Sequence, residues 1–291
     1  MGIVLAGGTG SRLWPITKGT SKQLLPIYNK PLVFFPISTL MMAGIQDILI
    51  ITTPDDRKAF ERCLGDGSSL NLNFIYTTQD QPRGLAEAFL IGEEFIGNES
   101  VALVLGDNIF HGKGMGRDLK KNQSIDGALI FACPVVNPSE YGVVDIDENG
   151  RPIKITEKPK HPTSHLAVPG LYFFDNEVIE IARGVEKSER GELEITSVIQ
   201  SYLDRKKLSL QIFPRSTSWF DAGTYESLLE ASEYVRIVEK RQGQMIANLE
   251  EISWRNGWID DQVFLQSNFS SQGTQYAEYK RNLIHEGVLL Q

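Results

Sequence analysis

Near its start the chain reads Ile3-Val4-Leu5-Ala6-Gly7-Gly8-Thr9-Gly10-Ser11-Arg12-Leu13, an apolar run that breaks into glycines and then into a hydroxyl residue and an arginine. The apolar run is typical of a buried strand. Glycines allow a tight turn and let a ligand approach the backbone amides, and amides that point into one concavity bind anions. The planar guanidinium of Arg12 also suits phosphate. The stretch therefore predicts a phosphate-binding turn at the end of a strand.

A second cation follows about ten residues later, in Ser21-Lys22-Gln23-Leu24-Leu25-Pro26. Two common glycine loops do not fit the first stretch. A P-loop needs Lys and then Ser or Thr after its last glycine, and the dinucleotide fingerprint needs a third glycine where this chain has Leu13. A glycine-rich turn without a ligand stays open for the loop alone. We interpret the glycines, Arg12 and Lys22 together as a triphosphate site.

Strand and helix patterns alternate through the first half of the chain. Strands are predicted at 47–53, 72–78 and 101–105, and helices at 31–43 and 54–64. This alternation indicates a parallel sheet with right-handed crossovers, in which ligands lie at the carboxyl ends of the strands. We therefore expect Gln79 and Asp107, which follow two of these strands, to lie near the glycine loop.

In the second half of the chain, strand and helix patterns no longer alternate regularly. Asn149-Gly150 between two alternating segments, 141–145 and 153–158, predicts a β-hairpin. A further strand is expected at 168–174 and a long amphipathic helix at 224–241. No linker separates the halves, so we expect one sheet. The predicted fold class is α/β: a three-layer, mostly parallel Rossmann-like sheet with an inserted hairpin region.

Composition limits the function classes. The 291 residues carry a formal net charge of -8, which argues against a nucleic-acid surface. The two cysteines lie in apolar stretches, so we expect no disulfide framework and a cytoplasmic location. A strand begins almost at the first residue, and no apolar run has the length of a bilayer span, so we expect neither a signal peptide nor a membrane partner.

Several ordered motifs closely resemble those of the sugar-1-phosphate nucleotidylyltransferases. They are the glycine stretch, the Ser21–Pro26 segment, Gly106-Asp107-Asn108, Glu157-Lys158-Pro159, Gly191-Glu192-Leu193-Glu194-Ile195-Thr196 and Trp219-Phe220-Asp221-Ala222-Gly223-Thr224. The resemblance covers roughly residues 1–260. It implies a nucleotidylyltransferase domain at 1–241, with a nucleotide-binding part at about 1–125 and a sugar-binding part at about 126–241. It also implies a C-terminal helical extension at 242–291 that contributes to a homotetramer and to regulation.

Two aspartates are candidates for a magnesium site. Asp107 follows a strand, and Mg²⁺ prefers one or two carboxylates together with substrate phosphates. From the residues alone, Asp107 is equally compatible with a turn, and an N-cap of the helix that follows stays an alternative for Asp221. The resemblance makes Asp107 and Asp221 the metal pair. His161 and His165 are separated by Pro162, which argues against a zinc site on a regular helix.

The resemblance also assigns the substrate contacts. It implies nucleotide binding by Gly7, Gly8, Gly10, Ser11, Arg12, Lys22, Gln23, Gln79, Gly84 and Asp107, with Gln79 and Gly84 at the base. It implies sugar binding by Asn108, Tyr141, Gly142, Glu157, Lys158 and Val168. Without the resemblance, a solvated charge pair is the favoured interpretation of Glu157 and Lys158, because most charge pairs are of that kind.

The reaction that the resemblance implies is nucleotidyl transfer from dTTP to glucose 1-phosphate, with Mg²⁺ as cofactor and Arg12, Lys22 and Lys158 as catalytic residues. The sugar phosphate is already anionic at neutral pH, so positioning and charge neutralisation suffice and no general base is needed. A UTP- or CTP-dependent sister enzyme stays open. So does a non-catalytic nucleotide-sugar sensor on the same fold. A Rossmann oxidoreductase is disfavoured by the missing third glycine.

Overall fold

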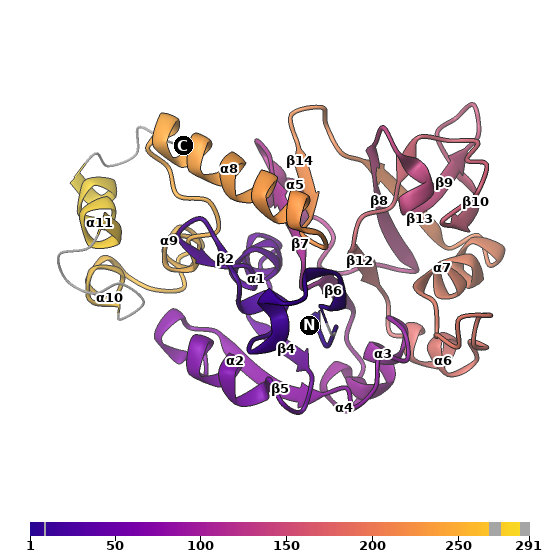
Figure 1. Ribbon diagram of the computed structural model, residues 1–291, viewed down its shortest axis with the longest axis horizontal. Coiled ribbons are helices and arrows are strands. Elements are labelled where there is room, and N and C mark those ends of the chain that lie inside the picture. The colour runs from indigo at the N-terminus through magenta and orange to yellow at the C-terminus, as the bar shows by residue number, and fades with distance from the viewer. Residues whose placement is uncertain (9, 268–274, 286–291) are drawn as a thin grey trace.

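A mixed ten-stranded sheet runs through the molecule (Figure 1). The computed structural model describes residues 1–8, 10–267 and 275–285. Nine strands follow the order β10-β9-β11-β8-β12-β6-β1-β4-β5, and β13 pairs with β8. Their bounds are β1 Gly2–Ala6, β4 Asp47–Thr52, β5 Asn73–Thr78, β6 Val101–Leu105, β8 Ala128–Pro134, β9 Gly142–Ile146, β10 Pro152–Glu157, β11 Leu166–Ala167, β12 Leu171–Phe174 and β13 Leu208–Ile212.

The core of the sheet is parallel, as predicted. β1 lies between β4 and β6, so that Val4 is opposite both Ile50 and Val104. Successive side chains of a strand point to opposite faces. Val4 and Ile50 therefore belong to one hydrophobic cluster, and Leu5 and Ile51 to another on the other face.

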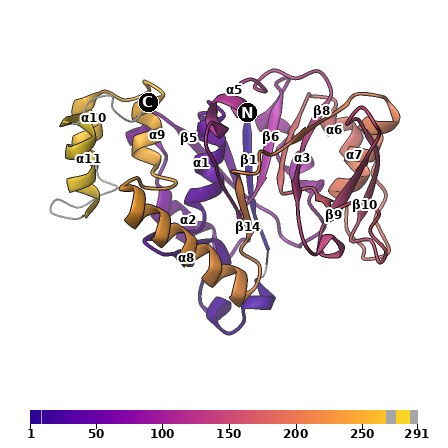
Figure 2. The same ribbon diagram turned by 90° about the horizontal axis from the view of Figure 1, so that it is seen from above.

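Helices cover both faces and complete the three predicted layers (Figure 2). One face carries α1 (Phe34–Met42) and α2 (Arg57–Leu64). The other carries α3 (Glu87–Ile91), α6 (Val178–Arg183) and α7 (Ile195–Asp204). Shorter segments are α4 (Glu93–Ile96) and α5 (Met115–Lys120). This arrangement leaves the carboxyl ends of β1, β4 and β6 as the edge at which a ligand can approach.

The second half extends the same sheet mainly with antiparallel strands. β12 pairs antiparallel with β6 and β8, while β13 is parallel to β8. β9 and β10 form the predicted hairpin, and Gly150 takes a positive φ of 77° in its turn. The prediction of one shared sheet with an inserted hairpin region is therefore confirmed.

Three predicted element boundaries are wrong. Pro31 does not begin a helix, because Lys30–Pro31 (β3) pairs with Pro26–Ile27 (β2), and α1 begins at Phe34. Pro54 lies in a turn held by the Thr53 and Asp56 side chains, and α2 begins at Arg57. The strand expected at 168–174 is broken between β11 and β12, because Leu171 N donates to Pro169 O in a tight turn.

A small second sheet, absent from the predictions, joins the two halves. β7 (Asn108–His111) pairs antiparallel with β14 (Ser218–Asp221), which places Asp221 opposite Asn108. The long helix α8 (Tyr225–Gln242) follows and is capped by Thr224 and Ser227. Asp221 is therefore not the cap of α8, and its carboxylate remains available at the edge of the sheet.

The C-terminal part consists of α9 (Leu249–Arg255), α10 (Asp261–Gln266) and α11 (Gln275–His285). In this part, Trp254 and Ile259 pack in a separate cluster with Phe264. Ile252 and Trp258 instead join the main core, because α9 packs on α1. A buried ion pair between Lys280 and Glu250 ties α11 to α9. Within the described residues, no helix is both long and apolar enough to span a bilayer.

Candidate active site

Two adjoining hollows lie along the carboxyl edge of the parallel strands. One has a volume of about 210 Å³ and the other about 180 Å³. Leu85 and Leu105 line both and form their common wall. The first is lined by Gly7, Gly8, Lys22, Gln23, Gln79, Gly84 and Asp107, all predicted to bind the nucleotide. The second is lined by every residue predicted to bind the sugar, together with Arg12 and Asp221.

Two of the residues predicted to bind the nucleotide, Gly10 and Ser11, line neither hollow. Gly10 takes a positive φ of 61° and precedes a short 3-10 helix, Ser11–Leu13. Its carbonyl accepts a hydrogen bond from the Thr17 hydroxyl. A side chain at Gly10 would come within 2.9 Å of Thr17, so this glycine serves the turn that carries Arg12. Nucleotide binding by Gly10 and Ser11 stays a prediction.

The loop that carries Gly84 is fixed by a second loop. Gly84 has a φ of +110°, and a Cβ there would lie 2.4 Å from Leu193 N and Leu193 O. Leu193 N donates to Arg83 O at 2.7 Å, and Ala86 N donates back to Leu193 O at 3.1 Å. The nearby Gln79 side chain is almost fully buried and donates to Glu87 Oε2 at 2.7 Å. Gln79 and Gly84, which are predicted to contact the base, therefore lie in a wall of the nucleotide hollow that hydrogen bonds within the chain already hold in place.

Lys22 and Asp107 form a close ion pair in the nucleotide hollow. Lys22 Nζ lies 2.5 Å from Asp107 Oδ2, and both side chains are largely buried. Burial raises the pKa of Asp107, but the Lys22 charge and the hydrogen bonds from Lys22 and Asn108 outweigh it and bring the pKa below its ordinary value. Asp107 is therefore ionised at neutral pH and offers a carboxylate at the junction of the hollows.

Asp221 lies at the same junction, but its pKa is raised, whereas that of Asp107 is lowered. Burial and the charge of Asp107 raise its pKa to about 6, against the opposing effect of Lys22, Arg12 and Lys158. Its Oδ1 atom is buried without a hydrogen-bond partner among the described residues. An unpartnered carboxylate oxygen beside a second carboxylate fits the donor set that Mg²⁺ prefers, in which substrate phosphates and water complete the shell. Within the described residues, no group of three or more His, Cys, Asp or Glu forms a closed metal cage.

Arg12 reaches this junction because Gly223 has no side chain. A Cβ on Gly223 would lie 2.9 Å from Asp221 Oδ1 and 3.0 Å from Arg12 Nη2. The Arg12 guanidinium and the orphaned carboxylate oxygen therefore both lie against Gly223. Three cations, Arg12, Lys22 and Lys158, act on the charge of Asp221, so the junction suits a polyanion.

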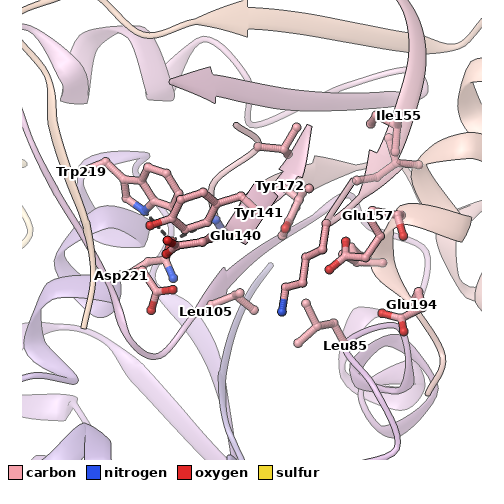
Figure 3. A pocket seen from close by; sticks show the side chains of 18 of the residues that line it. Leu85, Leu105, Glu140, Tyr141, Ile155, Glu157, Tyr172, Glu194, Trp219 and Asp221 are labelled. Carbon is pink, nitrogen blue, oxygen red and sulfur yellow. Dashed lines mark hydrogen bonds between the residues drawn. The ribbon is translucent and has the colours of Figure 1, made fainter. Parts of the chain in front are cut away.

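Two of the acids that line the sugar hollow lie across it from two of its aromatic rings, whereas Glu140 and Asp221 lie on the side of those rings (Figure 3). Glu157 and Glu194 lie on one side, and burial and the charge of Glu194 raise the pKa of Glu157. Tyr141 and Trp219 pack on the other side, with ring centroids 4.9 Å apart. Carboxylates beside aromatic walls suit a molecule with several hydroxyls and an apolar face.

Lys158 stands out for its backbone. It takes a positive φ of 40°, which a residue with a side chain rarely adopts. Its N–H donates to Tyr141 O at 3.0 Å, so the residue after β10 is tied to the residue before β9. Strain of this kind persists where surrounding structure enforces it, and it is frequent at functional sites.

The structure adds residues to which the sequence reasoning gave no role. Trp219 and Glu194 lie inside motifs quoted for the resemblance, and Glu87 and Gly170 lie outside them. Nothing in the sequence pointed to Glu87 or Gly170, because each contacts a residue outside its own local pattern. Glu87 accepts a hydrogen bond from Gln79, and Gly170 N donates to the side chain of Asn108.

Comparisons with known proteins agree with this geometry. The family model described as nucleotidyl transferase matches residues 1–237. A glucose-1-phosphate thymidylyltransferase of Mycobacterium tuberculosis is 55% identical over 97% of this chain and 98% of its own length. One from Mycolicibacterium smegmatis is 58% identical over 89% of this chain and 90% of its own. One from Neisseria meningitidis is 50% identical over 97% of this chain and 99% of its own.

Solved structures show the same fold. A putative glucose-1-phosphate thymidylyltransferase from Bacillus anthracis, in complex with a sucrose, has a TM-score of 0.75 and 38% identity; the match covers 81% of this chain and 94% of that one. A UDP-glucose pyrophosphorylase complexed with UDP-glucose has a TM-score of 0.72 and 27% identity, with 82% and 98% covered.

Proposed function

This chain belongs to the nucleotidyl transferase family, and we propose that it transfers the thymidylyl group of dTTP to glucose 1-phosphate with the help of Mg²⁺, giving dTDP-glucose and pyrophosphate. The observation that carries the proposal is the pair of hollows with a common wall and a charged junction. The nucleotide hollow would hold dTTP and the sugar hollow glucose 1-phosphate. Their phosphates would then meet between Arg12, Lys22, Asp107 and Asp221.

The residues at the junction have separate tasks in this reaction. The phosphate oxygen of glucose 1-phosphate attacks the α-phosphorus of dTTP, the bond to the β-phosphate breaks, and pyrophosphate leaves. Lys158 aims the attacking phosphate. Arg12 and Lys22 neutralise the charge that develops on the α-phosphate and on the departing pyrophosphate. The attacking oxygen carries no proton to remove, so the chain needs only to align the two substrates and exclude water.

Asp107 and Asp221 would hold Mg²⁺. Bound there, the ion supplies positive charge to the phosphate oxygens. Support for this site comes from the orphaned Oδ1 of Asp221 and from the repulsion between the two carboxylates, which a divalent cation relieves. The pKa of Asp221, about 6, still lies below 8, and that of Asp107 lies below its ordinary value, so both would be ionised at pH 8.

The choice of dTTP rests on the relatives. The three at 50–58% identity are glucose-1-phosphate thymidylyltransferases, whereas the UDP-glucose pyrophosphorylase structure is 27% identical. The base would lie against Gln79 and Gly84. The Gln79 amide already donates to Glu87 Oε2 and Gly84 O, so its Oε1 would contact the base by accepting from the N3–H on the edge of the pyrimidine. Thymine and uracil share that edge, so the two nucleotides differ here only by a methyl group.

Pyrophosphate release tests the proposal. The purified chain is incubated with Mg²⁺, glucose 1-phosphate and either dTTP, UTP, CTP, ATP or GTP, and the sugar nucleotide is identified by mass spectrometry. We expect the highest kcat/KM with dTTP and no release once EDTA is added. Preference for UTP or CTP would keep the reaction and overturn the base assignment. No release with any nucleotide would favour a nucleotide-sugar sensor.

We also propose that the chain assembles as a homotetramer through its C-terminal extension. The proposal rests on the resemblance given above. Light scattering coupled to size-exclusion chromatography measures the mass directly, and one chain has a mass of 32.6 kDa. A mass of about four chains is expected, and a mass of one or two chains would contradict it.

A further inference from the structure

We infer that the indole N–H of Trp219 is a positioning group, which acts through Asn108 to set the orientation of the Asp107 carboxylate. The inference rests on the proposed function for the identity of the cation that Asp107 helps to bind. It gives Trp219 a role in metal binding as well as in the wall of the sugar hollow.

A continuous chain of hydrogen bonds joins Trp219 to Asp107 through Asn108. Trp219 Nε1 donates to Asn108 Oδ1 at 2.7 Å, and Gly170 N donates to the same oxygen at 3.0 Å. Asn108 Nδ2 in turn donates to Asp107 Oδ1 at 2.9 Å. The Asn108 side chain has no access to replacement partners from solvent, because the residue is only 3% exposed.

The chemistry of the partners fixes the direction of this chain. An indole N–H and a backbone N–H can only donate, so the oxygen of the Asn108 amide must face Trp219 and Gly170. The NH₂ group must then face Asp107, whose ionised carboxylate can only accept. A rotated amide would place two donors together and leave an acceptor against a carboxylate. Trp219 therefore selects the amide orientation that supports Asp107.

The fold explains why this tryptophan is in place. Trp219 and Asp221 are two residues apart on β14, so their side chains share one face of the strand. The pairing of β14 with β7 puts Asp221 opposite Asn108. The break between β11 and β12 turns Gly170 N toward the same amide. One short strand thus supplies Asp221 and Trp219, both labelled in Figure 3. Through Asn108, Trp219 is also the group that orders Asp107.

Asp107 is held from both sides in this arrangement. Its Oδ1 accepts from Asn108, and its Oδ2 pairs with Lys22. Without the indole donor, Asn108 keeps one of the two bonds that orient its oxygen. A neutral hydrogen bond contributes about 1 kcal/mol net, which corresponds to about fivefold in an equilibrium constant. The expected effect of losing the donor is a comparable weakening of cation binding.

Trp219→Phe tests the inference, because it removes the N–H and leaves a ring beside Tyr141. Mn²⁺ is used as the probe, and free Mn²⁺ is counted by its electron paramagnetic resonance signal at about pH 8 without nucleotide. We expect the Kd for Mn²⁺ to rise about fivefold. The matched control is Trp254→Phe, since Trp254 Nε1 also donates to a carboxylate, Asp261 Oδ1 at 2.7 Å, in the C-terminal part. The control should bind Mn²⁺ like the wild type.

A double-mutant cycle with Asn108→Ala shows whether Trp219 acts through the amide. We expect Asn108→Ala to weaken Mn²⁺ binding as well, and Trp219→Phe to add little in that background. Additive effects, or an unchanged Kd in Trp219→Phe, would overturn the inference. If Trp219→Phe does not fold, as judged by thermal unfolding, the Mn²⁺ affinity of Asn108→Ala alone decides: an unchanged value overturns it.

Kinetics separate this role from that of a simple pocket wall. A positioning role predicts a lower kcat and a higher Mg²⁺ requirement, with a nearly constant KM for glucose 1-phosphate. If Trp219 served only as part of the pocket wall, its substitution would raise the KM for glucose 1-phosphate and leave kcat and the Mg²⁺ requirement nearly constant. The Mn²⁺ assay needs no turnover. Absence of pyrophosphate release in the wild type would therefore refute the proposed function, whereas equal Mn²⁺ affinity of the wild type and Trp219→Phe would refute the positioning role.

Discussion

Asp221→Asn should stabilise the substrate-free protein while abolishing its activity. Burial and the neighbouring charge of Asp107 raise the pKa of Asp221 to about 6, from an ordinary value of 3.8. The folded chain therefore carries an ionised carboxylate at pH 8 only at a cost in free energy. One pH unit corresponds to about 1.4 kcal/mol, so the full difference amounts to about 3 kcal/mol. Part of the charge is compensated through solvent and neighbouring cations, and we expect a gain of about 1–3 kcal/mol in the free energy of unfolding.

The pH dependence of this gain identifies its cause. Because the pKa of Asp221 is raised in the folded state, the penalty is fully present above about pH 6 and disappears as the pH falls toward 3.8. Urea unfolding in EDTA, followed by tryptophan fluorescence, should show a gain at about pH 8 that shrinks at about pH 5. Asp55→Asn, a substitution of an exposed carboxyl on the loop before α2, is the control and should change stability by less than about 0.5 kcal/mol. Equal or lower stability of Asp221→Asn at pH 8, or a gain that does not depend on pH, would refute the electrostatic argument.

Three further changes test other parts of the site. Arg12→Ala should lower kcat by about 10²-fold or more, because it removes a donor aimed at developing charge; near-wild-type turnover in a steady-state assay would remove Arg12 from the mechanism. Gly84→Ala should raise the KM for dTTP more than about tenfold, since φ is +110° and a Cβ would meet backbone atoms at 2.4 Å. Gly191→Ala is its control, because that residue also has a positive φ but open space around it, and an equal effect of both would mean that strain alone matters. Lys22→Met should abolish turnover yet tighten Mn²⁺ binding to the nucleotide-free protein about tenfold at pH 8, because the ammonium no longer occupies Asp107 Oδ2 and a charged hydrogen bond contributes about 1.5–3 kcal/mol; weaker binding in the resonance assay would show that Lys22 does not compete with the cation.

The parallel core was predictable because buried parallel strands are continuous apolar runs. A strand of this kind can be recognised from its own sequence, without knowledge of its neighbours, because nearly every side chain is buried on one face of the sheet or the other. Examples are Val101–Leu105 and Asp47–Thr52. The β9–β10 hairpin was equally accessible, because its turn residues, Asn149 and Gly150, are local. Helix starts were less predictable, since the pairing of Lys30–Pro31 with Pro26–Ile27 overrides the preference of proline for a first helical turn.

The small sheet β7–β14 could not be predicted from local patterns. Both strands have four residues, and their pairing joins segments more than a hundred positions apart. The hydrogen bond from Trp219 to Asn108 and the approach of Arg12 to Gly223 depend on that pairing. The sequence therefore led to the residues of the two hollows mainly through motif resemblance, whereas the contacts that orient those residues required the structure.

Direct attack of the sugar phosphate on the nucleotide is tested most directly by the stereochemistry at the α-phosphorus. One diastereomer of dTTP that carries sulfur on the α-phosphate is converted with glucose 1-phosphate, and the configuration of the sugar nucleotide is determined by ³¹P nuclear magnetic resonance. A single in-line displacement, in which Arg12, Lys22 and Lys158 only position and neutralise charge, predicts inversion. Retention would require two displacements through a covalent nucleotidyl-enzyme, and it would contradict the mechanism proposed for this site.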